Sequence, residues 1–254
     1  MVPAITTGCN TLTLPTATDP LYLVIDQGGH ATRALVFDQY GSVRHKETRD
    51  VAVQNLQHDR VEQDPDELVQ SLFAVLEQTG SRLGDKTRCI KAAALATQRS
   101  SIACWHRDSG KALSAIISWQ DRRARSQTES LSPYGNDIHR LTGLRLSPHY
   151  GASKLHWCLT NLPAVQQAWQ QQQLAWGPVA SFFLFHLLAE HPHLVDPVNA
   201  SRTLLWNRHT GEWDASLLQW FEVPGGPLPH CVANRYRYGH IKCGPCSIPM
   251  MLVT

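Results

Sequence analysis

The fold is decided by the stretch Leu21-Tyr22-Leu23-Val24-Ile25-Asp26-Gln27-Gly28-Gly29-His30-Ala31-Thr32-Arg33. Its uninterrupted apolar start predicts a strand buried on both faces. Asp26 closes the run and leads into Gly28-Gly29, so an acid and a bare backbone lie at the strand's end, where a metal ion and a phosphate could bind. Residues 34–38 then resume a strand, which predicts a hairpin. A Walker-type loop is excluded, because GxxxxGK[ST] does not occur in the chain.

The rest of the chain predicts strands followed by alternating helices and strands. Asp64-Pro65-Asp66-Glu67 has the pattern of a capped helix start, and apolar spacing carries that helix to about Gly80. The expected strands are 21–27, 33–39, 43–53, 90–96, 101–105, 114–119 and 174–179, and 204–213 forms a hairpin. One helix is expected to start at Asp121, and further helices are expected over residues 135–142, 152–160, 164–173, 182–188 and 215–221. This order favours an α/β fold with a mixed central sheet and helices on both faces.

Several further strings occur in an order that resembles the FGGY carbohydrate kinases and, within them, glycerol kinase. They are Thr97-Gln98-Arg99, Trp119-Gln120-Asp121-Arg122-Arg123, Lys154-Leu155-His156-Trp157 and Asn199-Ala200-Ser201-Arg202-Thr203. The likeness runs from about residue 21 to about residue 241 and covers only the amino-terminal half of that family. It implies a ribonuclease-H-like fold, shared with actin and hexokinase, in which a strand hairpin holds phosphate.

The resemblance also implies ATP and Mg²⁺ as cofactors. Asp26 suits the metal, because Mg²⁺ is usually held through one or two carboxylates and its own waters; taken alone, a strand-end Asp is more often a turn former. The residues that match the nucleotide site are Asp26, Gly28, Gly29, His30, Thr32 and Arg33. Glycerol kinases carry two threonines and a serine where this chain has Gly29, His30 and Ala31, so phosphate binding is expected to rely on the backbone and to be weaker.

By the same resemblance, the substrate residues are Arg99, Ser100, Trp119 and His149. A guanidinium is a planar, charged donor that can bind neighbouring hydroxyls, and an indole gives an apolar wall. Glycerol kinase has a glutamate at Ser100 and a tyrosine at His149, so two hydroxyl partners are lost. Asp121 follows Trp119 by two positions, as an acid does in other members of the family. Glycerol and a different polyol or sugar are therefore equally favoured as the substrate.

The family's catalytic aspartate, in a Gly-Asp-Gln string, and its adenine site belong to a second half with no counterpart here. Gly-Asp-Gln does not occur in the chain. We expect a flexible leader at residues 1–20, an FGGY amino-terminal domain at 21–241 and a tail outside the family at 242–254. Such a truncated chain should contain no catalytic residue and should be inactive by itself. The alternatives are a non-catalytic polyol-binding or regulatory remnant and an actin-like ATPase module.

Composition supports an ordinary globular protein. A formal charge of +2 and a pI near 8.2 give no field that would favour nucleic acid or a membrane surface as a partner. Residues 1–20 lack the basic start and apolar core of a signal peptide, which favours the cytoplasm. The sequence does not indicate an oligomeric state. Cys243-Gly244-Pro245-Cys246 matches a thioredoxin-type motif, but the residues that follow do not predict the helix that such redox chemistry requires.

Overall fold

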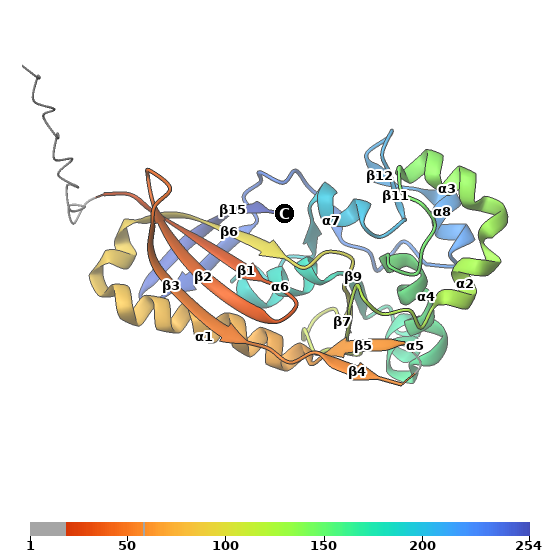
Figure 1. The fold of residues 1–254 in the computed structure, drawn as a ribbon, viewed down its shortest axis with the longest axis horizontal. Coiled ribbons are helices and arrows are strands. Elements are labelled where there is room, and N and C mark those ends of the chain that lie inside the picture. The colour runs from red at the N-terminus through yellow and green to blue at the C-terminus, as the bar shows by residue number, and fades with distance from the viewer. Residues whose placement is uncertain (1–18, 58) are drawn as a thin grey trace, which may run out of the picture.

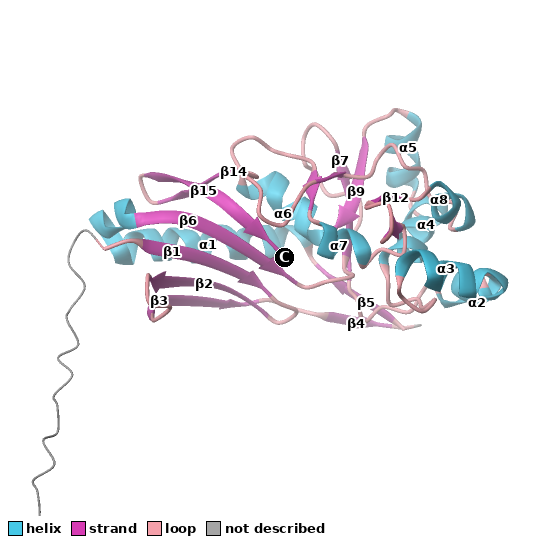
Figure 2. Ribbon diagram, turned by 90° about the horizontal axis from the view of Figure 1, so that it is seen from above, coloured by secondary structure: helices cyan, strands magenta, loops and turns pink. Residues whose placement is uncertain are grey.

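The structure is a computed structural model that describes residues 19–57 and 59–254, so nearly all of the expected leader lies outside the described residues. Two sheets organise the chain (Figure 1). A six-stranded sheet has the order β14-β15-β6-β1-β2-β3, and a five-stranded sheet has the order β4-β5-β8-β7-β9. The six-stranded sheet and the long helix α1 form one end of the molecule, and the shorter helices gather at the other end (Figure 2).

The strands of the six-stranded sheet are β1 (Leu21–Gln27), β2 (Ala31–Asp38), β3 (Val43–Asp50), β6 (Ile90–Thr97), β14 (Gly239–Cys243) and β15 (Cys246–Val253). Those of the five-stranded sheet are β4 (Gln54–Leu56), β5 (Arg60–Gln63), β7 (Ile102–His106), β8 (Ile116–Ile117) and β9 (Leu174–Pro178). Two short pairs are β10 (Leu194–Val195) with β13 (His230–Cys231), and β11 (Trp206–Asn207) with β12 (Glu212–Trp213).

The α-helices are α1 (Pro65–Leu83), α2 (Arg125–Ser130), α3 (Gly135–Thr142), α4 (Gly151–Asn161), α5 (Pro163–Gln170), α6 (Val179–Leu187), α7 (Pro197–Ser201) and α8 (Ala215–Trp220). Two 3₁₀ turns are η1 (Gly84–Cys89) and η2 (Ser132–Tyr134). No α-helix within the described ranges is both long enough and apolar enough to cross a bilayer.

Strand β1 is the centre of the fold. It pairs antiparallel with β2, where Asp26 lies opposite Arg33, and parallel with β6, where Asp26 lies opposite Ala96. The mixed sheet and the opening hairpin are therefore confirmed. Because β1 and β6 run in the same direction, the residues that follow them come out at the same edge of the sheet.

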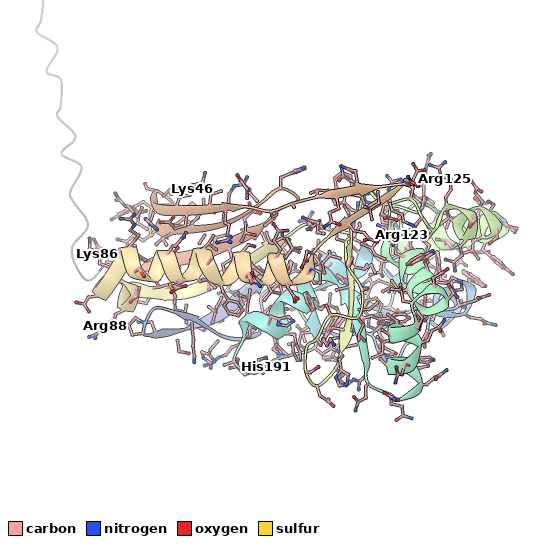
Figure 3. All side chains as sticks on the ribbon, turned by 90° about the horizontal axis from the view of Figure 1, so that it is seen from below. Lys46, Lys86, Arg88, Arg123, Arg125 and His191 are labelled. Atoms are coloured by element: carbon pink, nitrogen blue, oxygen red, sulfur yellow. The ribbon has the colours of Figure 1, made fainter. Side chains whose placement is uncertain are left out.

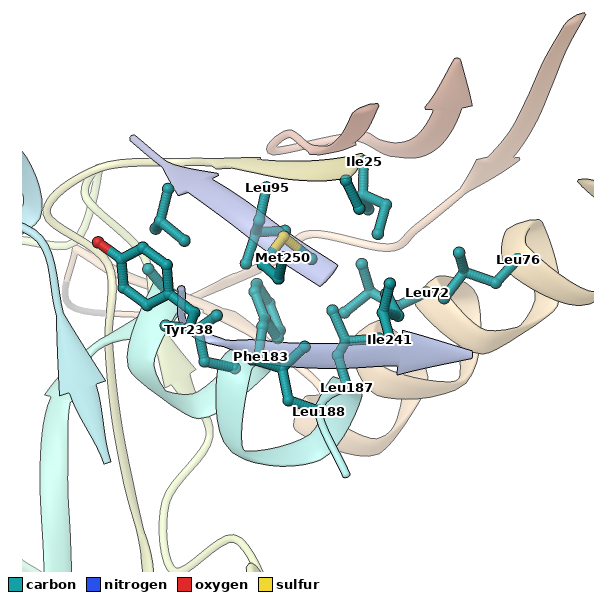
Figure 4. Packing of buried hydrophobic residues seen from close by; sticks show 14 of the residues in the cluster. Ile25, Leu72, Leu76, Leu95, Phe183, Leu187, Leu188, Tyr238, Ile241 and Met250 are labelled. Atoms are coloured by element: carbon teal, nitrogen blue, oxygen red, sulfur yellow. The ribbon is translucent and has the colours of Figure 1, made fainter. Parts of the chain in front are cut away.

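The main core lies between the sheet and the helices α1 and α6. Leu23 and Ile25 of β1 are almost completely buried, and they belong to one cluster with Leu72 of α1, Phe183 of α6 and Met250 of β15 (Figure 4). Burying side chains of this size contributes about 1.5–3 kcal/mol each. The alternating apolar positions of β1 thus fix which face of the sheet receives the helices.

The opposite face of the sheet is only partly covered. Strand β1 was expected to be buried on both faces, but α1 and α6 pack together against one face of it (Figures 2 and 3). Tyr22 and Leu252 are each 40% exposed. Val24 lies beside Leu35 on this face, and both are half-buried. The uninterrupted apolar run of β1 therefore does not mean that the strand is buried on both faces.

Helix α1 begins where the sequence predicts and ends later. Asp64 Oδ1 accepts hydrogen bonds from the amides of Asp66 (2.8 Å) and Glu67 (3.0 Å) and so caps the helix. The helix passes Gly80 and ends at Leu83. Gly80 is required by close packing, since a Cβ there would lie 2.6 Å from the backbone nitrogen of Gly244. The glycine thus marks a contact with another segment and not a helix end.

Residues 242–254 lie within the main sheet. Strand β15 runs parallel to β6, and both Met250 and Val253 are fully buried. Cys243 and Cys246 are paired residues on either side of the β14–β15 turn, both are free thiols, and a strand follows them. Burial raises the pKa of Cys243 to about 11. The motif therefore forms a hairpin turn with a buried first thiol, and a strand stands where thioredoxin-type chemistry requires a helix.

Two smaller expectations are also corrected. The third strand ends at Asp50 and not at residue 53, and the helix expected from Asp121 begins at Arg125. Asp121 is instead fully buried, and its Oδ2 accepts a hydrogen bond from the amide of Val61, 2.7 Å away. Its other oxygen, Oδ1, accepts a hydrogen bond from the Arg123 amide at 2.9 Å, so Asp121 fixes the turn before α2 and does not begin the helix.

Candidate functional site

The first part of the site is the end of β1. Asp26 Oδ2 accepts a hydrogen bond from Arg33 Nη1 across the hairpin at 2.9 Å, and both side chains remain more than one-third exposed. In the described part of the chain, Asp26 Oδ1 has no hydrogen-bond partner. Asp26 therefore offers an oxygen to solvent, which fits a carboxylate that could reach a hydrated Mg²⁺. No group of three or more metal-binding side chains occurs among the described residues, so such an ion would depend on its ligand for further oxygens.

The β1–β2 turn has an open backbone. The Gly28 amide donates to the Ala31 carbonyl at 2.9 Å and closes the turn. A Cβ at Gly29 would meet no atom within 4 Å, and the amides of Gly29 and His30 bind no acceptor within the described ranges. Free amides in a tight turn can receive an anion. Thr32, in contrast, is fully buried and shares a hydrogen bond with Ser71 Oγ at 2.6 Å, so its hydroxyl faces the core.

Three buried glutamines support this turn, and the sequence analysis gave them no role. Gln98 Nε2 donates to Gln27 Oε1 (3.1 Å) and to Gln63 Oε1 (2.7 Å). Gln63 Nε2 donates in turn to the Gly29 carbonyl at 2.9 Å. One indication of this role is present in the sequence: Gln27 ends an apolar strand, and Gln98 directly follows another. Their side chains hold the turn against the end of β6.

The same network reaches the second part of the site. Ser101 Oγ donates to Gln98 Oε1 at 2.8 Å and accepts from the Trp119 amide at 3.0 Å. Trp119 is 37% exposed, and its ring lies 5.6 Å from the ring of His149. Hydrogen bonds therefore run without a break from the hairpin turn to an indole–imidazole wall.

Arg99 and Ser100 connect the two parts, with different environments. Arg99 is exposed, follows β6 at the edge of the sheet that carries the hairpin, and donates to Thr254 Oγ1 at 3.4 Å. Ser100 is only 3% exposed, has a φ of 67°, and its Oγ has no partner in the described part of the chain. Arg99 is thus available to a ligand, whereas Ser100 lies mostly beneath the surface.

Lys154 organises this wall, and sequence reasoning assigned it no role. Its fully buried Nζ donates to the carbonyls of Ser118 (2.8 Å), His149 (2.8 Å) and Ser100 (3.2 Å). Burial lowers the pKa of Lys154 to about 7, while Asp121 acts in the opposite direction. Three carbonyl acceptors match the three N–H groups of the charged amine, so the lysine ties together the segments that carry Ser100, Trp119 and His149.

Asp121 has a structural role next to this lysine. Its carboxylate binds Arg123, with the Nη2 to Oδ2 distance at 2.8 Å, and Arg123 also reaches Glu62 Oε1 at 2.6 Å. The guanidinium of Arg123 lies over the Trp157 ring, 4.6 Å from its centroid. Asp121 is therefore held inside the second sheet and does not line the candidate wall.

The site lies along an open edge and not inside an enclosed cavity. Two cavities of about 560 and 610 Å³ are lined by other residues, the first around Glu62, Arg123 and Trp157 and the second around Arg125 and Ser147. Neither is lined by Asp26, Arg99 or His149.

Comparisons with known proteins agree with this geometry. A model of the FGGY family of carbohydrate kinases, N-terminal domain, matches residues 21–246. The chain is 34% identical to a glycerol kinase of Koribacter versatilis (strain Ellin345) over 235 residues, which cover 91% of this chain and 47% of that protein. It is 33% identical to a glycerol kinase of Burkholderia cenocepacia (strain HI2424), over 88% of this chain and 45% of that protein.

Solved structures give the same result for the fold. Plasmodium falciparum glycerol kinase with ADP superposes with a TM-score of 0.86 at 26% identity, over 92% of this chain and 48% of that chain. Xylulose kinase from Rhodospirillum rubrum superposes with a TM-score of 0.82 at 17% identity, over 92% and 48% of the two chains, which supports the fold alone. This chain spans about half the length of the curated relatives that it matches.

Proposed function

Because this chain belongs to the FGGY family of carbohydrate kinases, we propose that it forms the polyol-side domain of an enzyme that transfers a phosphoryl group from ATP to a hydroxyl of a small polyol or sugar. Phosphoryl transfer depends on positioning and on charge neutralisation more than on covalent chemistry. The residues described above fit both tasks, and their placement supports the proposal. A cytoplasmic location, where ATP is available, is part of it.

In this proposal the hairpin holds the nucleotide phosphates. The free amides of Gly29 and His30 would donate to phosphate oxygens, and Arg33 would add a charged donor from β2. Mg²⁺, held through Asp26, would neutralise phosphate charge. Thr32 has no place in this set, because its hydroxyl is bonded to Ser71 inside the core.

The substrate hydroxyls would bind on the other side of Gln98. Arg99 offers an exposed guanidinium, Trp119 offers a partly exposed indole for the carbon side of a polyol, and His149 lies against that indole. Ser100 is too buried to be a main contact. The set contains no group placed to accept the proton of the attacking hydroxyl, and the family's Gly-Asp-Gln string does not occur in this sequence.

One observation carries the proposal. The amide of Gln98 donates to the carbonyl of Gln27 at 2.9 Å, so the phosphate hairpin and the substrate wall come out at the same edge of the sheet. An actin-like ATPase would need the hairpin but not an arginine and an indole beside it. The curated relatives are glycerol kinases, which favours a kinase domain over a purely regulatory remnant.

The test is a set of binding measurements on the 254-residue chain. Arg99→Ala should weaken the binding of glycerol or xylitol about tenfold and change Mg²⁺·ADP binding by less than about twofold. Asp26→Asn should do the reverse, with its effect seen only when Mg²⁺ is present. Arg88→Ala, at the exposed far end of the molecule (Figure 3), is the control. Equal losses of both ligands in both variants would contradict the assignment.

A further inference from the structure

His30 lies at the tip of the β1–β2 turn and has an exposed side chain. Among the described residues, its imidazole forms no hydrogen bond, ion pair or ring contact. Its backbone amide also binds no acceptor there. The amide and the imidazole of this residue are therefore both available to a ligand at the turn.

Two hydrogen bonds fix the backbone that carries this imidazole. The Val51 amide donates to the His30 carbonyl at 3.0 Å, and Gln63 Nε2 donates to the Gly29 carbonyl at 2.9 Å. The protein thus uses both carbonyls at the tip of the turn, whereas the amides of the same two residues stay open. Because the turn is held before a ligand arrives, little backbone ordering opposes binding.

The fixed charges around the turn do not favour an anion. Arg33 is bonded to Asp26 at 2.9 Å, so the protein itself neutralises part of the arginine's charge. The neighbouring elements add Arg49 and Asp50 at the end of β3, and Glu67 of α1, which accepts the Ala52 amide. Three acids thus stand against two arginines. The phosphates of a nucleotide gain from every further cation in such a setting.

The turn also has few side-chain donors. Gly29, His30 and Ala31 carry no hydroxyl. The hydroxyl of Thr32 is bonded inside the core. The donors left for phosphate oxygens are the open amides, Arg33 and the imidazole. Histidine differs from the others because its charge changes between about pH 5 and pH 8, and its protonated ring has two N–H donors.

We propose that the imidazole of His30 binds the nucleotide phosphates in its protonated form, so that the affinity of this hairpin for a nucleotide rises as the pH falls. A charged N–H donor binds a phosphate oxygen more strongly than a neutral one. The imidazolium also supplies the cation that the fixed charges of the turn lack. The inference rests on the proposed nucleotide site and adds a titratable side chain to it.

The experiment measures the dissociation constant of Mg²⁺·ADP from about pH 5.5 to about pH 8.5, with the Gly29 amide followed by nuclear magnetic resonance. The phosphates of ADP take up a proton in the same range, so the informative quantity is a ratio between two proteins measured with the same ligand. The dissociation constant of His30→Gln divided by that of the wild type should be about five to ten at the acid end. It should fall to about one to two at the alkaline end.

Two further variants separate charge from other effects. His30→Lys keeps a positive charge at every pH of the experiment, so at about pH 8.5 it should bind Mg²⁺·ADP about fivefold more tightly than His30→Gln. His139→Gln is the matched control, because it removes an exposed histidine from α3 at the other end of the molecule (Figure 2). Its ratio to the wild type should stay near one at every pH. Thermal unfolding at each pH separates a folding defect from a binding defect.

The outcomes distinguish this inference from the proposed nucleotide site. A His30→Gln ratio that does not change with pH overturns the imidazolium ligand, and so does a His30→Lys protein that binds no more tightly than His30→Gln at about pH 8.5. The nucleotide site survives either result if Mg²⁺·ADP still shifts the Gly29 amide of the wild type. If Mg²⁺·ADP shifts that amide at no pH, both proposals are overturned. A ratio that rises toward acid for His30→Gln and stays flat for His139→Gln supports the inference.

Discussion

Lys154 Nζ donates a hydrogen bond to the carbonyl oxygen of His149, 2.8 Å away, and so fixes the end of the substrate wall from inside the core. The same amine reaches the carbonyls of Ser118 and Ser100. One buried side chain thus holds three loops that are far apart in the sequence, and the geometry of the wall depends on it.

Replacing this lysine should destabilise the protein. Lys154→Met leaves three buried carbonyls without a donor and should lower the free energy of unfolding by about 2–4 kcal/mol, as measured by urea denaturation. Lys91→Met, which removes an exposed lysine from β6, is the control and should change it by less than about 0.5 kcal/mol. Similar stabilities for the two variants would mean that the buried amine does not hold the loops.

Replacing each of two glycines by alanine should affect different properties. A Cβ at Gly80 would meet the backbone of Gly244 at 2.6 Å, so Gly80→Ala should lower the free energy of unfolding by about 1–3 kcal/mol despite the better helix propensity of alanine. Gly29→Ala meets no neighbour and should leave stability unchanged. It should, however, weaken Mg²⁺·ADP binding, because the methyl group occupies the open side of the turn. Thermal melts and titrations check both variants, and a stabilised Gly80→Ala protein would contradict the contact.

Acid should destabilise the chain through its buried histidines. Burial lowers the pKa of His193 to about 4, so the unfolded chain takes up this proton first, near pH 6.5. The stability contribution is complete above pH 6.5 and is lost as the pH falls through about 4. Over this pH window, the free energy of unfolding of the wild type should therefore fall by about 2–3 kcal/mol more than that of His193→Gln. Chemical denaturation at several pH values measures the difference, and parallel pH profiles would exclude His193 as the cause.

The glutamine network should couple both halves of the site. Gln98→Leu removes hydrogen bonds to Gln27, Gln63 and Ser101, so it should weaken both nucleotide and polyol binding, each by about tenfold. Gln127→Leu replaces a glutamine in α2 that bonds the Phe221 carbonyl, away from the candidate site, and serves as the matched control. A Gln98→Leu protein that binds both ligands normally would show that the network does not position the site.

The sequence predicted the order of the elements well, because hydrophobic period and capping are local. The hairpin at Asp26, the start of α1 and strands β6, β7 and β9 follow from neighbouring residues. Strands β4, β5, β14 and β15 were not expected. What could not be predicted depends on distant contacts. Gln98 meets Gln27 across 71 positions, Lys154 meets Ser100 across 54, and Gly80 meets the β14–β15 turn.

The candidate site also combines features that local patterns predict with features that depend on distant contacts. Motif matching proposed Arg99, Trp119 and His149 as substrate residues, but it could not tell that Thr32 faces the core or that Ser100 is buried. Strand alternation alone does not decide which face a residue after a turn will take, because one position of register reverses it.

The most direct test of the account is amide chemical-shift mapping of this chain by nuclear magnetic resonance, with Mg²⁺·ADP and a polyol added separately. The account predicts saturable shifts at Gly29 and His30 with the nucleotide, and at Arg99, Trp119 and His149 with the polyol. Asp26→Asn should reduce only the first set. Shifts from both ligands at one shared location, or saturable shifts confined to residues outside this edge of the sheet, would contradict a site built from the hairpin and the arginine–indole wall.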